Sequence, residues 1–355
     1  MRPGSFGIMV VAFAKFSCDF MGFGDDISPL WTKFIAILAV LVLTGINIVG
    51  VRAGGMVQNI LTAIKIFCLL AIIGIGVIFA LGALDAHEVA IETGTHKEGS
   101  FILLFGAALI PIMWTIGGWD ESPYVAEEVR NPERNLPLSI LGGLWTVAAL
   151  FVLVNIAYLA ILTPTEMAGS GLTATVAVKR ALGSGAGKFL DLALIICTLG
   201  AANGLALTGG RIAYAAGRSQ NLFRWFAKTH PRTKTPVRSL LAQCVITCLV
   251  VAILEHPLTL LFYTGLAYWT FAGLMAASVL VMRRRDPHRK RPFRVWGYPV
   301  VPILFVAASV GMAYSVVIED IRKNTYNAIA TVIILAVGAL LYLLQVVLFR
   351  KSENN

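Results

Sequence analysis

Residues 101–137 read FILLFGAALIPIMWTIGGWDESPYVAEEVRNPERNLP. The apolar first half is long enough to enter a bilayer, but it breaks at Gly117-Gly118 and continues into two adjacent carboxylates. Lipid offers no hydrogen-bond partner to an open backbone, so such a break is tolerated where it lines a cavity. Secondary transporters place their substrates at broken helices of this kind. The stretch therefore predicts a membrane protein that binds a solute near Gly117-Gly118.

The composition of the whole chain supports a membrane protein. Its 355 residues are 57% hydrophobic and 14% charged, with a mean hydropathy of +0.79. We expect roughly nine apolar spans of about 20 residues each, at about 34–50, 57–82, 101–126, 137–162, 188–214, 238–254, 258–282, 299–318 and 326–349. The first of these runs is short and needs flanking residues to cross a bilayer. An all-α polytopic membrane protein without separate soluble domains is the predicted fold class.

The net charge of +10 comes from basic clusters that lie between the expected spans. These clusters are Arg218–Arg238, Arg283–Arg285, Arg289–Arg291 and Arg350-Lys351. When the spans are threaded through a membrane, all four fall on one face, and the positive-inside rule assigns that face to the cytoplasm. We therefore predict a multi-pass protein of the cell membrane (plasma or inner) with a cytoplasmic C-terminus, and no nucleic-acid partner.

Motifs of soluble enzymes are incomplete in this sequence. Gly183–Lys188 is similar to a phosphate-binding loop, but Phe189 stands where that loop needs Ser or Thr. The five histidines lack the spacing of metal ligands. Four of the five cysteines lie in apolar runs, and Cys18 is predicted to lie alone in a loop on the outer face. We expect no enzyme activity, no cofactor and no metal.

Several segments together resemble the amino acid–polyamine–organocation (APC) superfamily of permeases, most closely its L-type amino acid transporter branch. The segments that carry the resemblance are Gly50–Ile60 with Lys65 (fifth span), Gly117–Trp119 and Glu127–Pro137 (sixth), Gly200–Gly204 with Thr208 and Arg211 (eighth), and Arg291–Arg294 with Gly297–Pro299 (before the eleventh). The sixth-span signature is the most specific of them.

The resemblance implies a LeuT-like inverted-repeat helical bundle, formed as a single transporter domain over residues 1–355. Within it, 1–16 would be a remnant of the third span, 34–82 the fourth and fifth, 101–282 the second repeat with spans six to ten, and 299–349 spans eleven and twelve. The first two spans, most of the third and the first-span Gly-Ser-Gly break have no counterpart. We therefore expect an N-terminally truncated member of the family.

The resemblance also implies a substrate site at the break in the sixth span. Carbonyls at the end of the outer half-helix would hold an α-ammonium group, with Trp114 as an aromatic gate. The implied substrate-binding residues are Trp114, Thr115, Ile116, Gly117, Gly118, Asn203, Gly204 and Tyr268. The alternatives are a Gly-Gly kink with a core Trp, and ordinary packing at Asn203, Gly204 and Tyr268. Asp120 and Glu121 suit a cationic substrate, a proton shuttle or ion pairs within the bundle.

Two further sites concern coupling and gating. By resemblance Lys65 fills the position where sodium-coupled relatives bind an ion, and a buried Lys can also exchange a proton; the alternative is a Lys that reaches the membrane surface. Glu127, Glu128, Arg130 and Arg134 are predicted to form an ion-pair network that latches the cytoplasmic gate, against the alternative of a solvated loop.

The predicted function is secondary active transport of amino acids by alternating access, either by exchange or coupled to protons. Its partners would be the amino acid substrate and the lipid bilayer, and whether a partner subunit exists stays open. The alternative is a truncated remnant of such a permease that does not transport. A membrane-embedded enzyme or receptor would need a polar catalytic cluster that the spans lack.

Overall fold

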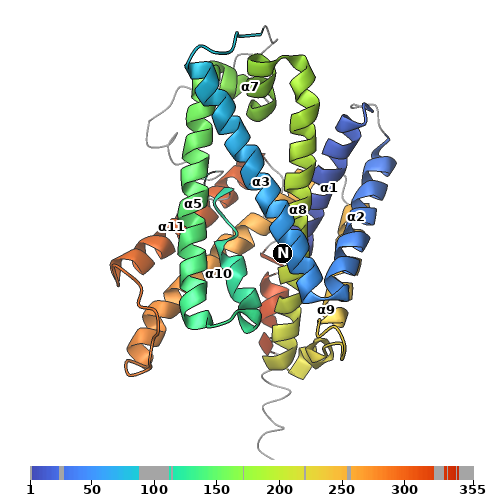
Figure 1. Cartoon of the computed structure of the whole chain (residues 1–355). Helices are drawn as coiled ribbons and strands as arrows, with labels where there is room; N and C mark the ends of the chain where they lie inside the picture. The colour runs from blue at the N-terminus through green and yellow to red at the C-terminus, as the bar shows by residue number, and fades with distance from the viewer. Residues whose placement is uncertain are drawn as a thin grey trace, which may run out of the picture.

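A computed structural model describes residues 2–23, 28–87, 112, 115–170, 172–219, 221–253, 257–323, 332–333, 335–340 and 342–343. Every regular element in these ranges is helical. The long helices lie side by side in one bundle, with α3 running obliquely across α5 and α8 (Figure 1). The bounds, in chain order, are α1 Arg2–Phe20, α2 Pro29–Val49, α3 Val51–Ala80, η2 Trp119–Glu128, α5 Pro132–Ile161, α6 Pro164–Gly169, α7 Thr173–Leu182, η3 Ser184–Ala186, α8 Gly187–Ser219, η4 Asn221–Ala227, α9 Val237–Ile253, α10 Pro257–Arg285 and α11 Val300–Lys323.

Six of the described helices are long and apolar enough to cross a membrane. They correspond to α2, α3, α5, α8, α10 and α11, and α9 is a shorter apolar helix. Large apolar side chains on the outer surfaces of these helices are not covered by other parts of the chain, among them Trp145 and Val152 of α5. An apolar belt of this extent is stable against lipid rather than water. The chain is an all-α, polytopic, multi-pass membrane protein.

The expected spans overlap these helices over most of the described chain, with ends that differ by up to about six residues, as at the start of α3. The short run 34–50 gains its length from its flank, because α2 begins at Pro29 and the Ser28 hydroxyl accepts a hydrogen bond from the Leu30 N–H. Proline and a serine cap are common at a helix start. Half of the expected span at 101–126 and most of the one at 326–349 lie outside the described residues. The described end of the former, from Trp119 on, is a 3-10 helix and not an α-helix.

The N-terminal helix α1 lies inside the bundle, where it packs against α8, α2, α9 and α10. Phe6, Val10 and Ala14 are fully buried in the apolar core that α1 shares with α2, α8 and α9. The helix is longer than the segment 1–16 expected from the sequence, since α1 continues to Phe20, and the assignment of this segment to a third span stays a prediction. The prediction for Cys18 was wrong: it lies in α1 with 2% of its surface exposed, not in an outer loop.

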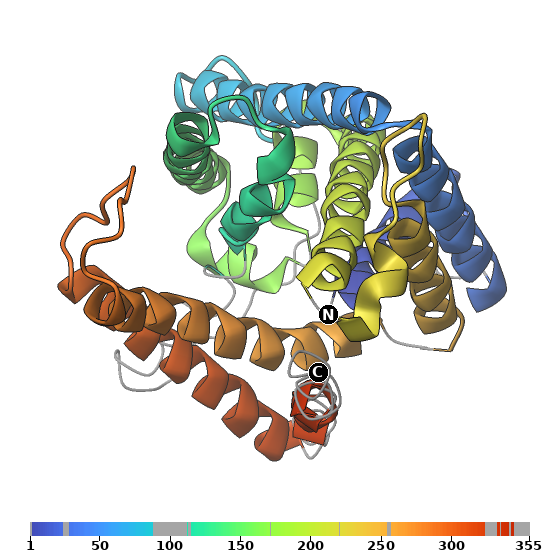
Figure 2. The same ribbon diagram turned by 90° about the horizontal axis from the view of Figure 1, so that it is seen from below.

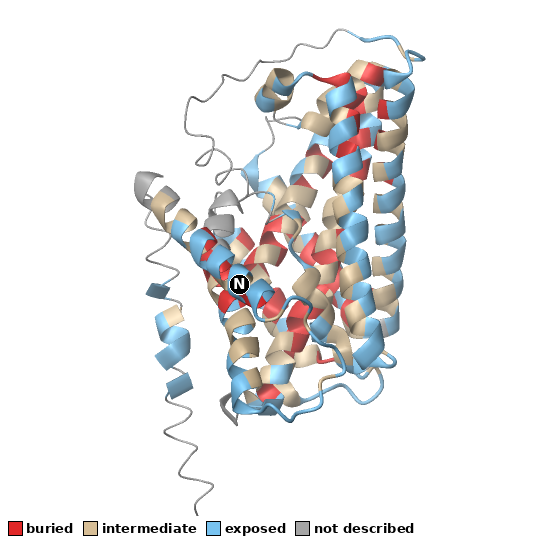
Figure 3. Cartoon of the chain, turned by 90° about the vertical axis from the view of Figure 1, so that its left-hand side faces the viewer, coloured by how far each residue is buried: buried red, intermediate tan, exposed pale blue. Residues whose placement is uncertain are grey.

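Buried residues concentrate where the long helices face one another, and exposed residues cover the outer flanks (Figure 3). A second core joins α3, α5, α7 and α8 through Ile72, Val154, Val178 and Leu190. On another side of the bundle, α10 and α11 lie next to each other (Figure 2). A Cβ at Gly273 of α10 would lie 3.0 Å from Cβ of Ser309 of α11, so a small residue permits this close approach.

The short helices α6 and α7 lie together at one end of the bundle (Figure 1). Thr163 and Glu166 form a capping box at the start of α6, and Glu166 Oε1 accepts a 2.7 Å ion-pair bond from Arg180 of α7. The Thr163 backbone N–H, followed by the Thr163 hydroxyl and Arg180, holds the pKa of Glu166 below its ordinary value, against an opposing effect of burial. This carboxylate therefore stabilises the α6–α7 turn at neutral pH, and that stabilisation is lost as the pH falls through the lowered pKa.

Gly76 of α3 sets how closely α3 and α5 approach. A Cβ at this position would overlap the Ala157 side chain and lie 2.7 Å from the Ala157 Cα, which is backbone and cannot rotate away. We expect Gly76→Ala to lower the stability of the detergent-solubilised protein by about 1–3 kcal/mol, the cost of an overpacked contact. The measurement is a thermal unfolding midpoint.

Gly74 provides the matched control on the same helix. A Cβ there meets no atom within 4 Å, so Gly74→Ala should be neutral or slightly stabilising through better helix propensity. Equal midpoints for the two variants would show that the α3–α5 crossing does not depend on Gly76.

Candidate functional site

The α-helical path of the chain ends just before Gly117-Gly118. The Ile116 N–H still donates a 3.0 Å helical bond to the Ile112 carbonyl, and the chain then leaves the helix. Gly118 has φ of +92°, a left-handed conformation that side chains with a Cβ rarely adopt. The next ten residues form the 3-10 helix η2, with Asp120 and Glu121 in its first turn. Trp114 lies outside the described residues.

An ion cluster joins this break to α1. Arg2 donates from Nη1 to Glu121 Oε1, and its Nη2 lies 3.1 Å from Asp120 Oδ2. The three side chains are largely enclosed, with 19%, 23% and 11% of their surfaces exposed, respectively. The Arg2 guanidinium also lies over the Tyr124 ring, 4.9 Å from its centroid, so η2 holds it on two sides.

Two further helices meet the same carboxylates. The Tyr268 hydroxyl of α10 donates a 3.2 Å hydrogen bond to Asp120 Oδ1. The Thr208 hydroxyl of α8 is within hydrogen-bonding distance of both Glu121 Oε2 and, at 2.9 Å, the Gly204 carbonyl oxygen. The broken segment thus connects α1, α8 and α10 through one polar cluster. Of the three roles that the sequence leaves open for Asp120 and Glu121, ion pairing within the bundle is present.

Arg2 was not predicted as a site residue. It pairs with residues 118 and 119 positions further along the chain, and no local spacing links them. The available signal was weak: a single arginine stands directly before the apolar run that forms α1. A cation at the start of a helix that packs inside the bundle needs a nearby anion, but the sequence does not show that α1 is internal.

Asn203 forms a second polar network, with neighbours from α2 and α3. Its Nδ2 donates to Gln58 Oε1 at 2.9 Å and to the Gly54 carbonyl at 3.3 Å, and its Oδ1 accepts from Asn47 Nδ2 at 3.1 Å. Asn203 is fully buried. A Cβ on Gly204 would meet Gln58 at 3.5 Å, so Gly204 also faces α3. The substrate contacts predicted for both residues stay predictions.

Lys65 of α3 lies against the glycine-rich part of α8. A Cβ on Gly200 would lie 3.0 Å from Lys65 Cε and 3.2 Å from Lys65 Nζ. The Lys65 side chain therefore runs through space that the absence of a side chain at Gly200 leaves open. The side chain is half-buried, on the face of α3 that also presents Gln58 to α8.

At the end of η2, Glu127 Oε1 pairs with Arg218 Nη1 of α8 at 2.7 Å. The sequence pattern predicts a network of Glu127 with Arg130 and Arg134, and the pair with Arg218 is an addition to it. Arg130 and Arg134 are both exposed, and the Arg130 carbonyl accepts a bond from Asn135 Nδ2. Nothing is described of the Glu128 side chain. The ion pair between η2 and the end of α8 is exposed, so it contributes little stability by itself.

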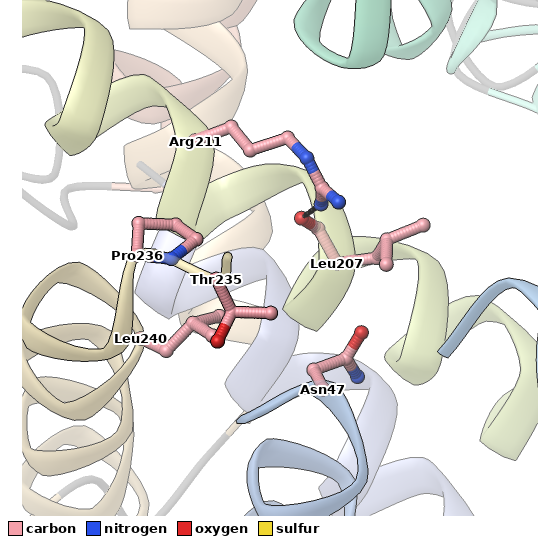
Figure 4. Close-up of a pocket in the computed structure, with 6 residues that line it drawn as sticks. All are labelled: Asn47, Leu207, Arg211, Thr235, Pro236 and Leu240. Carbon is pink, nitrogen blue, oxygen red and sulfur yellow. Dashed lines mark hydrogen bonds between the residues drawn. The ribbon is translucent and has the colours of Figure 1, made fainter. Parts of the chain in front are cut away.

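A small hollow lies on the α9 side of α8 (Figure 4). Its lining comprises Asn47, Leu207, Arg211, Thr235, Pro236 and Leu240. Arg211 is buried, and its guanidinium donates to the Leu207 carbonyl one turn earlier (Figure 4). This hollow is separate from the ion cluster at the break, because its lining includes none of the residues in that cluster.

Comparisons with known proteins place these features in a family. The model of a family described as amino acid permease matches residues 3–339. The chain is 32% identical over 348 residues to the human b(0,+)-type amino acid transporter 1, a match that covers 98% of this chain and 69% of that protein. It is 31% identical over 321 residues to the serine/threonine exchanger SteT of Bacillus subtilis (strain 168), covering 90% and 70%.

The large neutral amino acids transporter small subunit 2 of Mus musculus is 30% identical over 283 residues, covering 78% of this chain and 52% of that protein. The chain thus spans from about half to about seven tenths of the length of these relatives. All three are named as transporters or exchangers of amino acids. The match over nearly the whole sequence, on a helical bundle broken at Gly117-Gly118, shows that this chain belongs to the amino acid permease family.

Proposed function

We propose that this chain carries amino acids across the cell membrane by alternating access, by exchange or by coupling to protons. The observation that carries the proposal is the helix break at Gly117-Gly118, which opens backbone among the membrane helices of a family of amino acid permeases. The inverted-repeat arrangement expected from the sequence would let one part of the bundle rock against the other around this break. No chemical step is part of the proposal, since the family and its named relatives are transporters.

The break offers a site for the two charged ends of an amino acid. Carbonyls that end the helix before Gly117 carry the negative end of its dipole and suit an α-ammonium group. Thr115, Ile116, Gly117 and Gly118 would supply this surface, and Trp114 would close over the substrate side chain. Tyr268 supports the same location, because its hydroxyl bonds to Asp120, two residues after Gly118. Asn203 and Gly204 would line the α8 side, one turn before Thr208.

Coupling and gating are assigned to two other places. Lys65 would hold or exchange the coupling cation between α3 and α8. Glu127, with Glu128, Arg130 and Arg134 nearby, would latch the inner gate, and its contact with Arg218 links that latch to α8. The basic loops would face the cytoplasm.

The test is uptake of radiolabelled amino acids into proteoliposomes that contain the 355-residue chain. A panel of neutral, cationic and anionic amino acids is offered to vesicles with and without an internal amino acid load, and with and without an imposed pH gradient. Saturable uptake that depends on the load indicates exchange, and dependence on the pH gradient indicates proton coupling. Correctly inserted protein without saturable uptake of any amino acid in the panel would contradict the proposal.

Gly118→Val tests whether the geometry of the break matters. The left-handed conformation costs a residue with a Cβ about 1–2 kcal/mol, equivalent to about tenfold in an equilibrium, and a β-branched side chain is least compatible with it. We expect uptake to fall by at least about tenfold in the proteoliposome assay. Gly118→Asn should retain more activity, because Asn tolerates this conformation.

Gly142→Val is the matched control for this substitution. Gly142 lies in α5 with helical backbone, and a Cβ there meets no atom within 4 Å. Its uptake should stay close to that of the unmodified chain. If Gly118→Val transported as well as Gly142→Val, the left-handed turn at Gly118 would have no part in transport.

A further inference from the structure

The hydrogen bonds at Thr208 indicate where one proton lies. The Thr208 oxygen is within hydrogen-bonding distance of both the Gly204 carbonyl oxygen and Glu121 Oε2. A threonine hydroxyl has one hydrogen and can donate it to one partner. A carbonyl oxygen only accepts, and so does an ionised carboxylate. Both contacts are hydrogen bonds at the same time if Glu121 carries a proton, donates it to Thr208 Oγ1, and Thr208 donates to Gly204.

The charges of the cluster lead to the same result by a separate argument. Among the residues that the structure describes, Arg2 is the one cation in contact with Asp120 and Glu121, so this cluster carries one excess negative charge when both carboxylates are ionised. Asp120, Glu121 and Arg2 are largely enclosed among membrane helices, where an uncompensated charge is strongly disfavoured. One proton on the carboxylate pair makes the cluster neutral.

The position of the proton follows from the partners of each carboxylate. Asp120 accepts from the Tyr268 hydroxyl and faces Arg2 Nη2, so both of its partners are donors and neither offers an acceptor for a carboxyl proton. Glu121 Oε1 accepts a hydrogen bond from Arg2. Glu121 Oε2 faces the Thr208 oxygen, which can accept a hydrogen bond from a protonated carboxyl. The proton therefore belongs on Glu121 Oε2.

On the neighbouring elements, none of the charged side chains that the structure describes, apart from Arg2, is paired with Asp120 or Glu121. On α8, Arg211 donates to the Leu207 carbonyl and lines the hollow toward α9, and Arg218 pairs with Glu127. On α5, Glu133 and Arg134 lie exposed in the first turn. Tyr124 of η2 and Tyr268 of α10 have phenol side chains, which carry no positive charge in either protonation state.

From these contacts we infer that Glu121 is a proton-binding site, which carries one proton at neutral pH and donates it to Thr208. When the proton leaves, the O–H bond of the Glu121 carboxyl breaks and the proton passes to water. The Glu121 carboxylate then competes with Asp120 for Arg2, and the Thr208 hydroxyl turns from Gly204 to Glu121. This change alters the contacts among α1, η2 and α8 at the break. Proton binding itself is independent of transport, whereas its use for coupling rests on the proposed function.

The test is infrared difference spectroscopy of the full chain in lipid, titrated over pH and followed at the C=O stretch of protonated carboxyls. The unmodified chain should show one protonated carboxyl at neutral pH that Glu121→Gln removes. Glu133→Gln is the control, because it removes an exposed carboxyl outside the cluster and should leave the band in place. The proposal is overturned if no protonated carboxyl is present at neutral pH, or if Glu121→Gln leaves the band unchanged.

Two further variants test the arguments separately. Asp120→Asn removes the excess negative charge, so Glu121 should lose its proton at a lower pH than in the unmodified chain. Thr208→Val removes the acceptor and should move the band, whereas Thr208→Ser should leave it in place. If neither Asp120→Asn nor Thr208→Val changes the position or the pH dependence of the C=O band, the assignment to Glu121 is contradicted, whatever the uptake assay shows. A normal titration in a protein without uptake would instead contradict the proposed transport alone.

Discussion

Arg2→Met is expected to lower the stability of the protein by about 3 kcal/mol, because it leaves Asp120 without its cation among membrane helices. The three side chains keep 11% to 23% of their surface exposed, so we place the loss at the low end of the range for a broken buried pair. For a chain of this size we expect the unfolding midpoint to fall by about 6 °C. Midpoints can be followed by labelling of the buried thiols Cys18 and Cys244 with a thiol-reactive dye in detergent.

The chain offers close controls for this variant. Lys15→Met removes a cation from the exposed side of the same helix and should change the midpoint little. Arg2→Lys keeps the charge but loses the two-pronged geometry of the guanidinium. Its unfolding midpoint should therefore lie between those of Arg2→Met and Lys15→Met. The double variant Arg2→Met with Asp120→Asn should recover part of the loss, since it removes the pair together. If Arg2→Met unfolded at the temperature of Lys15→Met, the cluster would contribute nothing to the bundle.

The helices could be predicted well because their signal is local. A run of about 20 apolar residues is favourable in lipid wherever it stands in the fold, and the bounds of α5, α8, α9 and α10 agree with the expected spans to within a few residues. The ends are harder, since capping depends on single residues: α2 begins at Pro29 after its Ser28 cap, before the apolar run itself. The break at Gly117-Gly118 was equally visible, because a glycine pair followed by carboxylates is rare in an apolar run.

Contacts between distant segments could not be predicted in this way. Nothing local shows that α1 lies inside the bundle, and the loop expected at Cys18 and the missed role of Arg2 share that cause. Glu127 shows the same limit on a smaller scale, because charges close in sequence were grouped although its partner Arg218 lies on another helix. Charge type is readable from the sequence, but pairing depends on how helices pack.

Asn203 shows why residue type alone does not decide between a substrate contact and a structural one. A buried amide in a membrane helix needs partners for both its donor and its acceptor. Asn203 finds them in Asn47, Gln58 and the Gly54 carbonyl, which tie α8 to α2 and α3. The sequence motif that resembles the eighth span of the family is therefore also a packing motif, in which glycines admit the polar side chains of α3.

Lys65→Ala is expected to abolish amino acid uptake or its dependence on a pH gradient, while membrane insertion remains intact. A lysine inside a membrane helix costs about 2.5–3.5 kcal/mol on insertion scales, so removing it should not harm insertion. The side chain lies between α3 and α8, and the space it uses depends on Gly200. The environment of a cation held between two helices changes when those helices move relative to each other. Coupling requires that its binding depend on the conformation of the bundle in this way.

Gly200→Val examines the same role without removing the charge. Its Cβ would lie 3.0 Å from Lys65 Cε and 3.1 Å from Leu61 Cβ, so the Lys65 side chain has to move. Uptake and pH dependence should then change in the same direction as in Lys65→Ala. Gly142→Val on α5 is the matched control, because a Cβ there meets no atom within 4 Å and Gly142 belongs to neither proposed site. Normal pH-dependent uptake by Lys65→Ala would mean that Lys65 only reaches toward the membrane surface and has no part in coupling. Coupling would then depend on another group. Glu121 is the candidate, because it already connects the break to α8 through Thr208.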